Sequence, residues 1–347
     1  MPCAPDPQRH GRIAFWLIMA LFAAGPAWAA PDRAAVLQLA RSIVKVEVAG
    51  DGGRIHLGTG TVVAQERVVT ACHVTRRASR IHVLHGGLRL PVTLQRADMD
   101  HDLCLLVVPD LEALPAALGH GDPLRIGDPV VALGFTGGAG LSPAFGTIAG
   151  LHHIDGARVV QSDAAFTSGA SGGGMFDERG SLVAILLFRM RGPGPQFFAV
   201  PVEWFDERIA SPEPYRAIEP LAGAPFWARP LDDLPGFMHA ITLEAEARWT
   251  DLQAYADRWA ASDPASADAA YWQGFAAFRS GRDDTAIEAF ERAARLDRRH
   301  ALAWYDLGRT YLHAGRPADA RAVVPALLSA SEPLARRLID ALPELPD

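Results

Sequence analysis

The sequence predicts a chain of two parts, an all-β domain built from two small barrels followed by an α-helical repeat segment. Short β-type runs separated by glycine-rich turns fill residues 34–205. Prolines then recur from 212 to 235, and from about Leu243 the chain is rich in Ala, Arg and Leu with helical periodicity. With 347 residues, 49% of them apolar, the chain can bury the cores of two domains.

Eight runs of β-branched and other apolar residues are the expected strands of the β domain, and their density without long helices favours closed sheets. We place a signal segment at 1–29, the β domain at 30–205, a proline-rich linker or wrapping segment at 206–242 and a helical domain at 243–347. The expected strands are Ile43–Val48, Gly58–Val63, Arg67–Thr70, Leu103–Val108, Pro129–Gly134, Arg158–Gln161, Leu182–Leu187 and Phe197–Val200.

The first 29 residues have the pattern of a secretory signal. Arg9 and Arg12 form a basic start, Ile13–Gly25 is an apolar run of 13 residues, and Ala27-Trp-Ala29 is a small-x-small cleavage site. The run is too short for a permanent membrane-spanning helix, which needs about 20 residues; an uncleaved anchor is the alternative. We therefore expect a secreted or periplasmic protein with no stable membrane span after cleavage.

Charge and cysteine content limit the function further. The formal net charge is −7 at pH 7, so the chain has no electrostatic reason to bind nucleic acid. Outside the signal only Cys72 and Cys104 remain. They are expected to be either a disulfide, worth about 3–4 kcal/mol for a loop of this length, or two buried thiols. A Cys/His metal site is a third option that no tight ligand spacing supports, so neither a metal nor another cofactor is expected.

The helical part contains an internal repeat. Residues 267–300 align with residues 301–334 at an offset of 34, which is the tetratricopeptide period. Small residues at matched positions let two antiparallel helices approach closely, so the segment resembles a short tetratricopeptide-like array with flanking helices as caps. The matched pairs include Gly274 with Gly308, Gly281 with Gly315, Ala286 with Ala320, Phe290 with Val324, and Ala293 with Leu327.

Three separate segments carry the residues of a nucleophilic triad, in the order His73, Asp102, Ser171. A serine hydroxyl is a weak nucleophile at neutral pH, so it needs a base such as His73 to take its proton. Asp102 would accept the other imidazole N–H and fix the tautomer. The glycine-rich turn around Ser171 would aim the N–H groups of Gly169 and Ser171 at an oxyanion. Asp100, on the same face of the expected strand as Asp102, is the alternative acid.

Residues 40–201 resemble the trypsin-like serine proteases, and in particular their bacterial HtrA/Deg-like branch. The resemblance covers about half of the chain and implies a chymotrypsin-like double barrel and a serine endopeptidase that cleaves proteins or peptides through an acyl-enzyme, in a bacterial periplasm or outside the cell. The motifs that carry it, in order, are Gly58-Thr-Gly-Thr-Val-Val63, Val68-Val-Thr-Ala-Cys-His73, His101-Asp-Leu-Cys-Leu-Leu106, Gly127-Asp-Pro-Val-Val-Ala-Leu-Gly134, Gln161-Ser-Asp-Ala-Ala165, Gly169-Ala-Ser-Gly-Gly173 and Phe198-Ala-Val-Pro201.

The resemblance also implies a substrate pocket formed by Ala165, Phe166, Leu186 and Leu187. Its floor has no carboxylate, since Ala165 stands where the family sets primary specificity, and an Arg or Lys side chain would be buried unpaired there. We therefore expect cleavage after small or medium apolar residues.

The helical repeats stand where HtrA relatives usually carry a PDZ domain, and their groove is a candidate site for a protein partner. The alternative function is a catalytically silent protease-fold scaffold that binds partners through these repeats, and an esterase on the same fold is a third hypothesis. Because all three triad residues are present, we favour the enzyme.

Overall fold

The structure is a computed structural model. The signal predicted at 1–29 lies outside the residues that it describes. Among the described helices, none combines the length and apolar character needed to cross a membrane. The described residues are 33–50, 54–121, 123–138, 140–190, 192, 194, 196–209 and 214–343.

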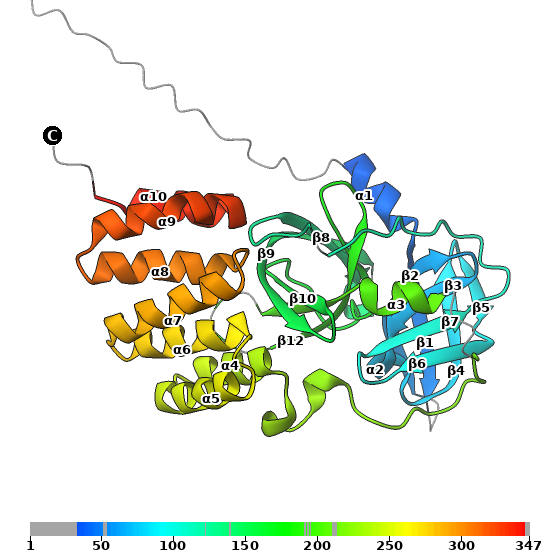
Figure 1. Ribbon diagram of the computed structural model, residues 1–347. Coiled ribbons are helices and arrows are strands. Elements are labelled where there is room, and N and C mark those ends of the chain that lie inside the picture. Colours follow the sequence, from blue (N-terminus) through cyan, green and yellow to red (C-terminus); the bar gives the residue numbers. More distant parts are fainter. Residues whose placement is uncertain are drawn as a thin grey trace, which may run out of the picture. The chain divides into compact units, whose positions relative to one another are not determined.

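The first β unit is a seven-stranded sheet in the order β5-β4-β1-β2-β3-β7-β6, with every neighbouring pair antiparallel (Figure 1). Alternate residues of β1 point into its core, where Val44, Val46 and Val48 are almost fully buried. Helix α1 (Arg33–Ala40) precedes the sheet, and helix α2 (Cys72–Thr75) follows β3. The strands are β1 (Ile43–Gly50), β2 (Ile55–Ala64), β3 (Arg67–Ala71), β4 (Ala78–His85), β5 (Leu88–Pro91), β6 (Leu94–Asp98) and β7 (Leu103–Val107).

The second β unit is a closed barrel in the order β10-β13-β12-β11-β8-β9. Its interior is filled by apolar side chains such as Val130, Ile148 and Met175, each at most 1% exposed. A short 3₁₀ helix, η2 (Thr136–Gly138), follows β8. The strands are β8 (Pro129–Phe135), β9 (Leu141–Ile154), β10 (Ala157–Ser162), β11 (Gly174–Phe176), β12 (Leu182–Arg189) and β13 (Phe197–Pro201).

The two-part β architecture agrees with the prediction, with differences in detail. Among the described residues only the second unit closes on itself, whereas the first is a sheet with β5 and β6 at its edges. All eight predicted runs form strands, but β4, β5, β6, β9 and β11 were not predicted. The apolar signal of β5 and β9 is weak because most of their residues are exposed or half-buried.

The proline-rich segment lies against the first β unit. After helix α3 (Glu203–Ile209), residues 214–235 contain only two short 3₁₀ helices, η3 (Phe226–Ala228) and η4 (Leu231–Asp233). Gln95 on edge strand β6 exchanges both backbone hydrogen bonds with Arg216, each 2.8 Å long. Further along, Leu221 N donates to Arg76 O and Phe226 N donates to Asp100 O. The segment therefore pairs with an edge that would otherwise be open.

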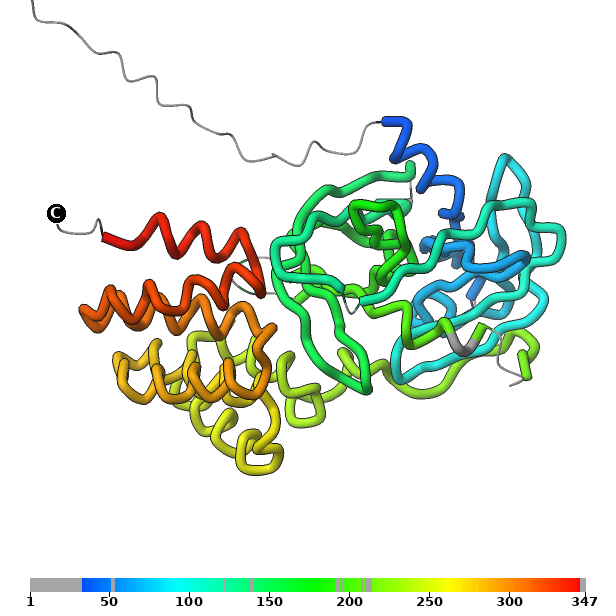
Figure 2. Tube along the Cα trace, turned by 45° about the horizontal axis from the view of Figure 1, so that its top comes forward, coloured from blue at the N-terminus to red at the C-terminus, as the bar shows by residue number. Residues whose placement is uncertain are grey.

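Seven helices follow among the described residues, stacked in chain order (Figures 1 and 2). They begin at Gly236, ahead of the expected Leu243, because Pro235 is the last proline of the segment and occupies the N-cap of the first helix. The helices are α4 (Gly236–Ala245), α5 (Trp249–Ser262), α6 (Ala267–Arg279), α7 (Asp283–Leu296), α8 (Ala301–His313), α9 (Pro317–Ala330) and α10 (Glu332–Ala341).

The helix ends follow the 34-residue period found in the sequence. Ser266 and His300, 34 positions apart, cap α6 and α8 by accepting a hydrogen bond from the third residue beyond them. Gly281 and Gly315 both adopt φ of +71°, the left-handed conformation that allows the chain to reverse after each of these helices. The 34-residue period therefore determines where the chain turns between helices as well as how the helices pack.

The helical segment packs on the closed barrel. Ser331 Oγ, at the start of α10, donates to Ile126 O (2.7 Å). The His152 ring on β9 is stacked on Phe237 of α4, with centroids 4.3 Å apart, and bonds Gln161 Oε1 (2.8 Å). Burial lowers the pKa of His152, which favours the neutral imidazole at this apolar contact. His152 is therefore a packing residue between the closed barrel and helix α4.

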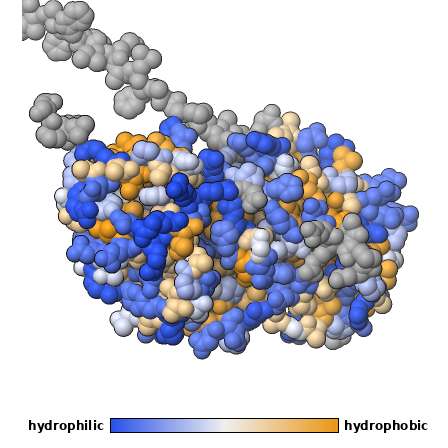
Figure 3. Space-filling view, viewed as in Figure 1, coloured by the Kyte–Doolittle hydropathy of each residue, from blue (hydrophilic) through white to orange (hydrophobic). Residues whose placement is uncertain are grey.

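The outer surface is predominantly hydrophilic on the face shown in Figure 3, with smaller hydrophobic areas between the polar ones. The exposed large apolar side chains are spread over the chain, from Leu37 and Ile55 to Leu328 and Ile339. Such scattered apolar residues are usual for a protein surface.

Glu244 makes the stability of the helical segment depend on pH. Burial raises the pKa of this α4 carboxyl group from 4.5 to about 7. Folding therefore takes up a proton between these two pH values, and the free energy of unfolding falls as the pH rises through this range. We expect Glu244→Gln to match the wild type below pH 4.5 and to be more stable by about 2–3 kcal/mol above pH 7.

Urea unfolding of both proteins at pH 4, 5.5 and 7.5 measures this difference, with Glu288→Gln, at an exposed position of α7, as the control. Parallel pH profiles for the wild type and Glu244→Gln would contradict the assignment.

Candidate functional site

His73 and Asp102 are in direct contact, although 29 positions separate them in the chain. His73 lies on the short helix α2, immediately after β3. Its Nδ1 is 2.6 Å from Asp102 Oδ2, and its backbone N–H donates to Asp102 Oδ1 (2.7 Å). The Asp102 side chain is fully buried, whereas that of His73 is 29% exposed. The carboxylate therefore holds the imidazole by one nitrogen and leaves the other available for chemistry.

Asp102 lies in the turn that directly precedes β7, next to the strand predicted at Leu103–Val108. The turn covers residues 99–102, and β7 begins at Leu103. Asp102 has a φ of +60°, a left-handed conformation that Asp tolerates better than most residues. Its own carbonyl accepts from Cys72 N (3.0 Å), so the turn is tied to the start of α2.

The two residues that precede Asp102 in the chain contact other side chains. Asp100, the alternative acid, forms an ion pair with Arg229. His101 bonds Asp98 (2.7 Å) and Asp155 (3.2 Å), and the hydrogen bond that its ring donates to Asp98 raises the pKa of His101. Residues 99–102 form a turn, so the alternation of side chains between the two faces of a strand does not apply to Asp100 and Asp102. The tertiary contacts themselves place Asp102, and not Asp100, at His73.

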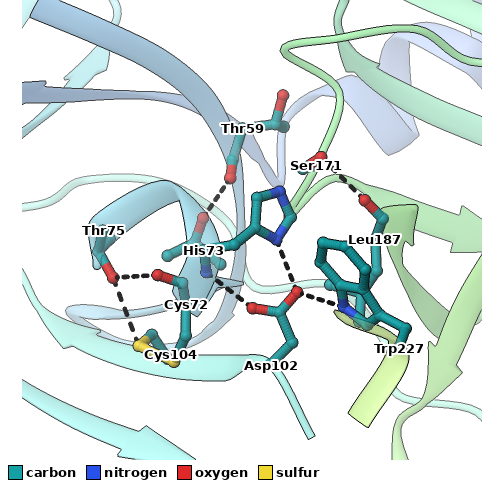
Figure 4. A network of polar contacts seen from close by, with 10 residues as sticks. Thr59, Cys72, His73, Thr75, Asp102, Cys104, Ser171, Leu187 and Trp227 are labelled. Atoms are coloured by element: carbon teal, nitrogen blue, oxygen red, sulfur yellow. Dashed lines mark hydrogen bonds and ion pairs between the residues drawn. A yellow bond between two sulfur atoms is a disulfide. The ribbon is translucent and has the colours of Figure 1, made fainter. Parts of the chain in front are cut away.

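Ser171 lies on the side of the imidazole ring away from Asp102 (Figure 4). Its loop connects β10 to β11 and is held by Thr59 of β2. Thr59 Oγ1 donates to Gly169 O (2.6 Å), and Thr59 N donates to Ser171 O (3.0 Å). The Ser171 hydroxyl itself donates to Leu187 O (3.0 Å). The structure therefore brings all three predicted triad residues to one place, with the hydroxyl turned toward a backbone carbonyl.

Gly172 shows why the loop must be rich in glycine. Its φ is +88°, and a Cβ atom there would lie 2.1 Å from Thr59 O and 2.4 Å from Thr70 Oγ1. Any other residue would force the Ser171 loop away from the first β unit. The close approach of the two β units thus depends on this position.

The two candidate oxyanion donors lie in the same loop. Gly169 has a φ of +96°. The amides of Ala170 and Gly172 donate to Thr167 O (3.1 Å) and Leu186 O (2.8 Å). For the amides of Gly169 and Ser171, no acceptor is found among the described residues. These two N–H groups are thus available to a ligand, as oxyanion donors must be.

The four residues expected to form a substrate pocket have different surroundings. Ala165 is exposed. Phe166 and Leu186 are buried together in the core of the closed barrel, where the Phe166 ring is 5.3 Å from that of Phe197. Leu187 is buried in the separate, larger apolar cluster that continues into the helices. A pocket common to all four remains a prediction.

Trp227 contacts both His73 and Asp102 and was not found from the sequence. Its Nε1 donates to Asp102 Oδ2 (2.9 Å), and its ring meets the His73 ring edge-on with centroids 5.4 Å apart (Figure 4). Trp227 lies 125 positions after Asp102, in the proline-rich segment. No local motif marks it, so only the folded arrangement shows the contact.

A cavity of about 500 Å³ adjoins this arrangement. It reaches from strand β12 across the proline-rich segment to helix α4, and its walls are mostly apolar. The residues that line it include Phe188, Met190, Trp227, Leu234, Met238 and Glu246.

Cys72 and Cys104 form a disulfide, which decides between the two states that the sequence left open. Their Cα atoms are 4.9 Å apart. Cys104 lies on β7 opposite Thr70 of β3, and Cys72 directly precedes His73. The bond therefore ties the helix that carries His73 to the strand that follows Asp102. Among the described residues, no group of three or more His, Cys, Asp or Glu side chains is arranged to hold a metal ion.

Comparison with protein families identifies both parts of the chain. Residues 58–185 match the trypsin-like peptidase domain. Residues 237–298 and 277–342 match tetratricopeptide repeat families. These matches cover the Ser171 loop, His73 and Asp102 on one side and the helices on the other.

Similar proteins include DegP-like and MamE proteases. The chain is 32% identical over 155 residues to a probable periplasmic serine endoprotease DegP-like of Chlamydia trachomatis, a match that covers 42% of this chain and 31% of that protein. It is 32% identical over 149 residues to the periplasmic serine endoprotease DegP of Salmonella typhimurium (39% and 31% covered). It is 30% identical over 145 residues to the magnetosome formation protease MamE of Magnetospirillum gryphiswaldense (38% and 18% covered). The chain thus spans less than a third of these relatives' length.

Solved structures that match over most of their own length include a mycobacterial protease. The Rv3671c protease from M. tuberculosis in its active form has a TM-score of 0.50 and 24% identity, covering 56% of this chain and 92% of that one. At this identity the likeness concerns the fold.

The disulfide makes a measurable contribution to stability. The double variant Cys72→Ala/Cys104→Ala, which leaves no lone thiol, should lose about 3–4 kcal/mol of unfolding free energy, because the unfolded chain is no longer closed into a loop. Urea unfolding measures the loss, and reduced wild type is the control that should lose a similar amount. Equal stability of oxidised wild type and double variant would show that the bond does not form.

Proposed function

We propose that this chain, which combines a trypsin-like peptidase domain similar to that of the DegP-like proteases with a C-terminal tetratricopeptide segment, is a serine endopeptidase. The observation that carries the proposal is the buried Asp102 carboxylate bonded to His73 Nδ1, with Ser171 across the imidazole ring. A histidine held by a buried carboxylate on one nitrogen, with a serine across its ring, is the arrangement that activates a serine nucleophile.

In the proposed reaction His73 is the general base. Because Nδ1 bonds Asp102, Nε2 is the nitrogen that takes the Ser171 proton. The hydroxyl first exchanges its bond to Leu187 O for one to Nε2, a rotation within the side chain. Its oxygen then attacks the peptide carbonyl, and His73 returns the proton to the leaving amine as the peptide bond breaks. Water hydrolyses the acyl-enzyme by the same steps, with His73 again acting first as base.

The amides of Gly169 and Ser171 are the proposed donors to the oxyanion of the tetrahedral intermediate. Donors of this kind contribute about 3–4 kcal/mol each to the stability of the transition state. Asp102 stabilises the imidazolium that forms at the same moment, so negative and positive charge develop between groups that are already in position.

We propose protein or peptide substrates cleaved after small or medium apolar residues, in a periplasmic or secreted location. The absence of a carboxylate at Ala165 supports this preference. The family match of the helices supports a role in protein interaction, either with a substrate or with a partner.

A fluorophosphonate probe tests the enzyme against the scaffold. The wild type should be labelled and Ser171→Ala should not, since only an activated serine reacts with the probe. Ser168→Ala, an exposed serine of the same loop, is the matched control and should label like the wild type. A wild type that remains unlabelled would favour the scaffold.

A peptide library that varies only the residue before the cleaved bond tests the specificity. We expect kcat/KM for Ala, Val or Leu to exceed that for Arg or Lys by about a hundredfold or more, because a buried cation without a partner costs several kcal/mol. A preference for Arg or Lys would overturn the proposed pocket.

A further inference from the structure

We infer that Trp227 is a positioning residue for the triad. Its indole N–H donates a hydrogen bond that fixes the orientation of the Asp102 carboxylate, and this carboxylate in turn orients the His73 imidazole. The inference deepens the proposed function and rests on it, because a positioning role has meaning only if His73 acts as a base. The basis is the hydrogen bond from Trp227 Nε1 to Asp102 Oδ2, 2.9 Å long, at a carboxylate with no exposed surface.

The donors around Asp102 show what Trp227 adds. Oδ1 accepts from the His73 backbone N–H (2.7 Å), and Oδ2 accepts from His73 Nδ1 (2.6 Å) and from Trp227 Nε1 (2.9 Å). Two of these three donors belong to His73, the residue that has to be positioned. Trp227 is thus the donor, among the described residues, that orients the carboxylate independently of His73. A charge-assisted bond of this kind is about twice as strong as a neutral one.

The indole is itself held from several sides. Its face is stacked on Phe188, with centroids 5.1 Å apart and planes at 19°. Phe188 follows Leu187, whose carbonyl accepts the Ser171 hydroxyl. The indole therefore contacts both the acid and the strand segment that accepts the hydrogen bond of the nucleophile. Phe226, directly before Trp227 and 2% exposed, anchors the segment by donating its N–H to Asp100 O (2.9 Å). Arg229 adds the ion pair to Asp100.

Trp204 offers a matched comparison for a packing role. Trp204 is buried (7% exposed), whereas Trp227 is half-buried, and Trp204 packs on His101 and on Phe226. Its indole Nε1 is buried without a hydrogen-bond partner in the described part of the chain. Both tryptophans thus pack on aromatic rings near the site, and they differ in whether the indole N–H reaches a charged acceptor.

The residue that positions the triad lies outside the β domain. Trp227 belongs to the segment that leads into helix α4, and the cavity beside it is lined by Trp227 and by Met238 of that helix. The geometry of Asp102 therefore depends on how residues 214–235 are seated on the first β unit.

The kinetic test is Trp227→Phe, which keeps an aromatic ring for stacking on Phe188 and removes the donor. We expect kcat on a short peptide to fall about ten- to a hundredfold with KM within about threefold, because the lost bond orients reacting groups and does not bind substrate. Trp204→Phe makes the same change of ring and removes an indole N–H that has no acceptor among the described residues, so it should keep kcat within about threefold. Equal kcat for the wild type and Trp227→Phe would overturn the inference.

A spectroscopic test does not depend on turnover or on the stability of Trp227→Phe. In protein labelled with ¹⁵N at the indoles, the Trp227 N–H proton should move upfield by about 0.5 ppm or more in Asp102→Asn, because a neutral amide is a weaker acceptor than a carboxylate. The Trp204 proton serves as the internal control and should stay in place. A Trp227 proton that does not respond would exclude the hydrogen bond.

Fluorophosphonate labelling of the wild type and the turnover of Trp227→Phe together separate this inference from the proposed function. If fluorophosphonate labels the wild type and Trp227→Phe turns over like the wild type, the positioning role is wrong and the endopeptidase stands. If the wild type is not labelled, the endopeptidase is wrong, and the positioning role falls with it whatever the indole spectrum shows.

Discussion

The buried carboxylate of Asp102 is the constraint on which the site depends. An ionised carboxylate without exposed surface is tolerated only when donors surround it, because its desolvation otherwise costs several kcal/mol. The donors come from two segments, helix α2 with His73 and the proline-rich segment with Trp227, and the acid itself sits in the turn before β7. Stabilising this one charge thus requires that three distant parts of the chain are folded together.

The second requirement is the contact between the two β units at Thr59. Its hydroxyl donates to Gly169 O and accepts from Phe135 N (2.9 Å), while its backbone N–H donates to Ser171 O. These bonds hold the nucleophile loop of the barrel against the first sheet, which supplies His73 and Asp102. The site is therefore a property of the junction between the β units, since neither unit contains all of its groups.

The helical segment is connected to the same framework. Its 34-residue period fixes helix ends at equivalent positions, and its contacts at Ile126 and His152 seat it on the closed barrel. Because the segment that joins it to the β domain also carries Trp227, the helices and the proposed catalytic groups share one stretch of chain.

The sequence by itself determined what depends on local residues. Strands such as β1 and β12 were predicted from apolar runs, the helical repeat from its period, and Ser171 from the glycines that a tight turn needs. The sequence also marked His73 and Asp102 as candidates, and family matches cover both parts of the chain.

The tertiary structure decided what depends on which distant residues meet. It brought Asp102, and not Asp100, to His73, because both residues lie in the turn before β7, where Asp102 contacts His73 and Asp100 pairs with Arg229. It joined Cys72 to Cys104 and placed Trp227 at the buried carboxylate. A hydrogen bond between residues 125 positions apart leaves no pattern in either local sequence, so only the folded chain shows it.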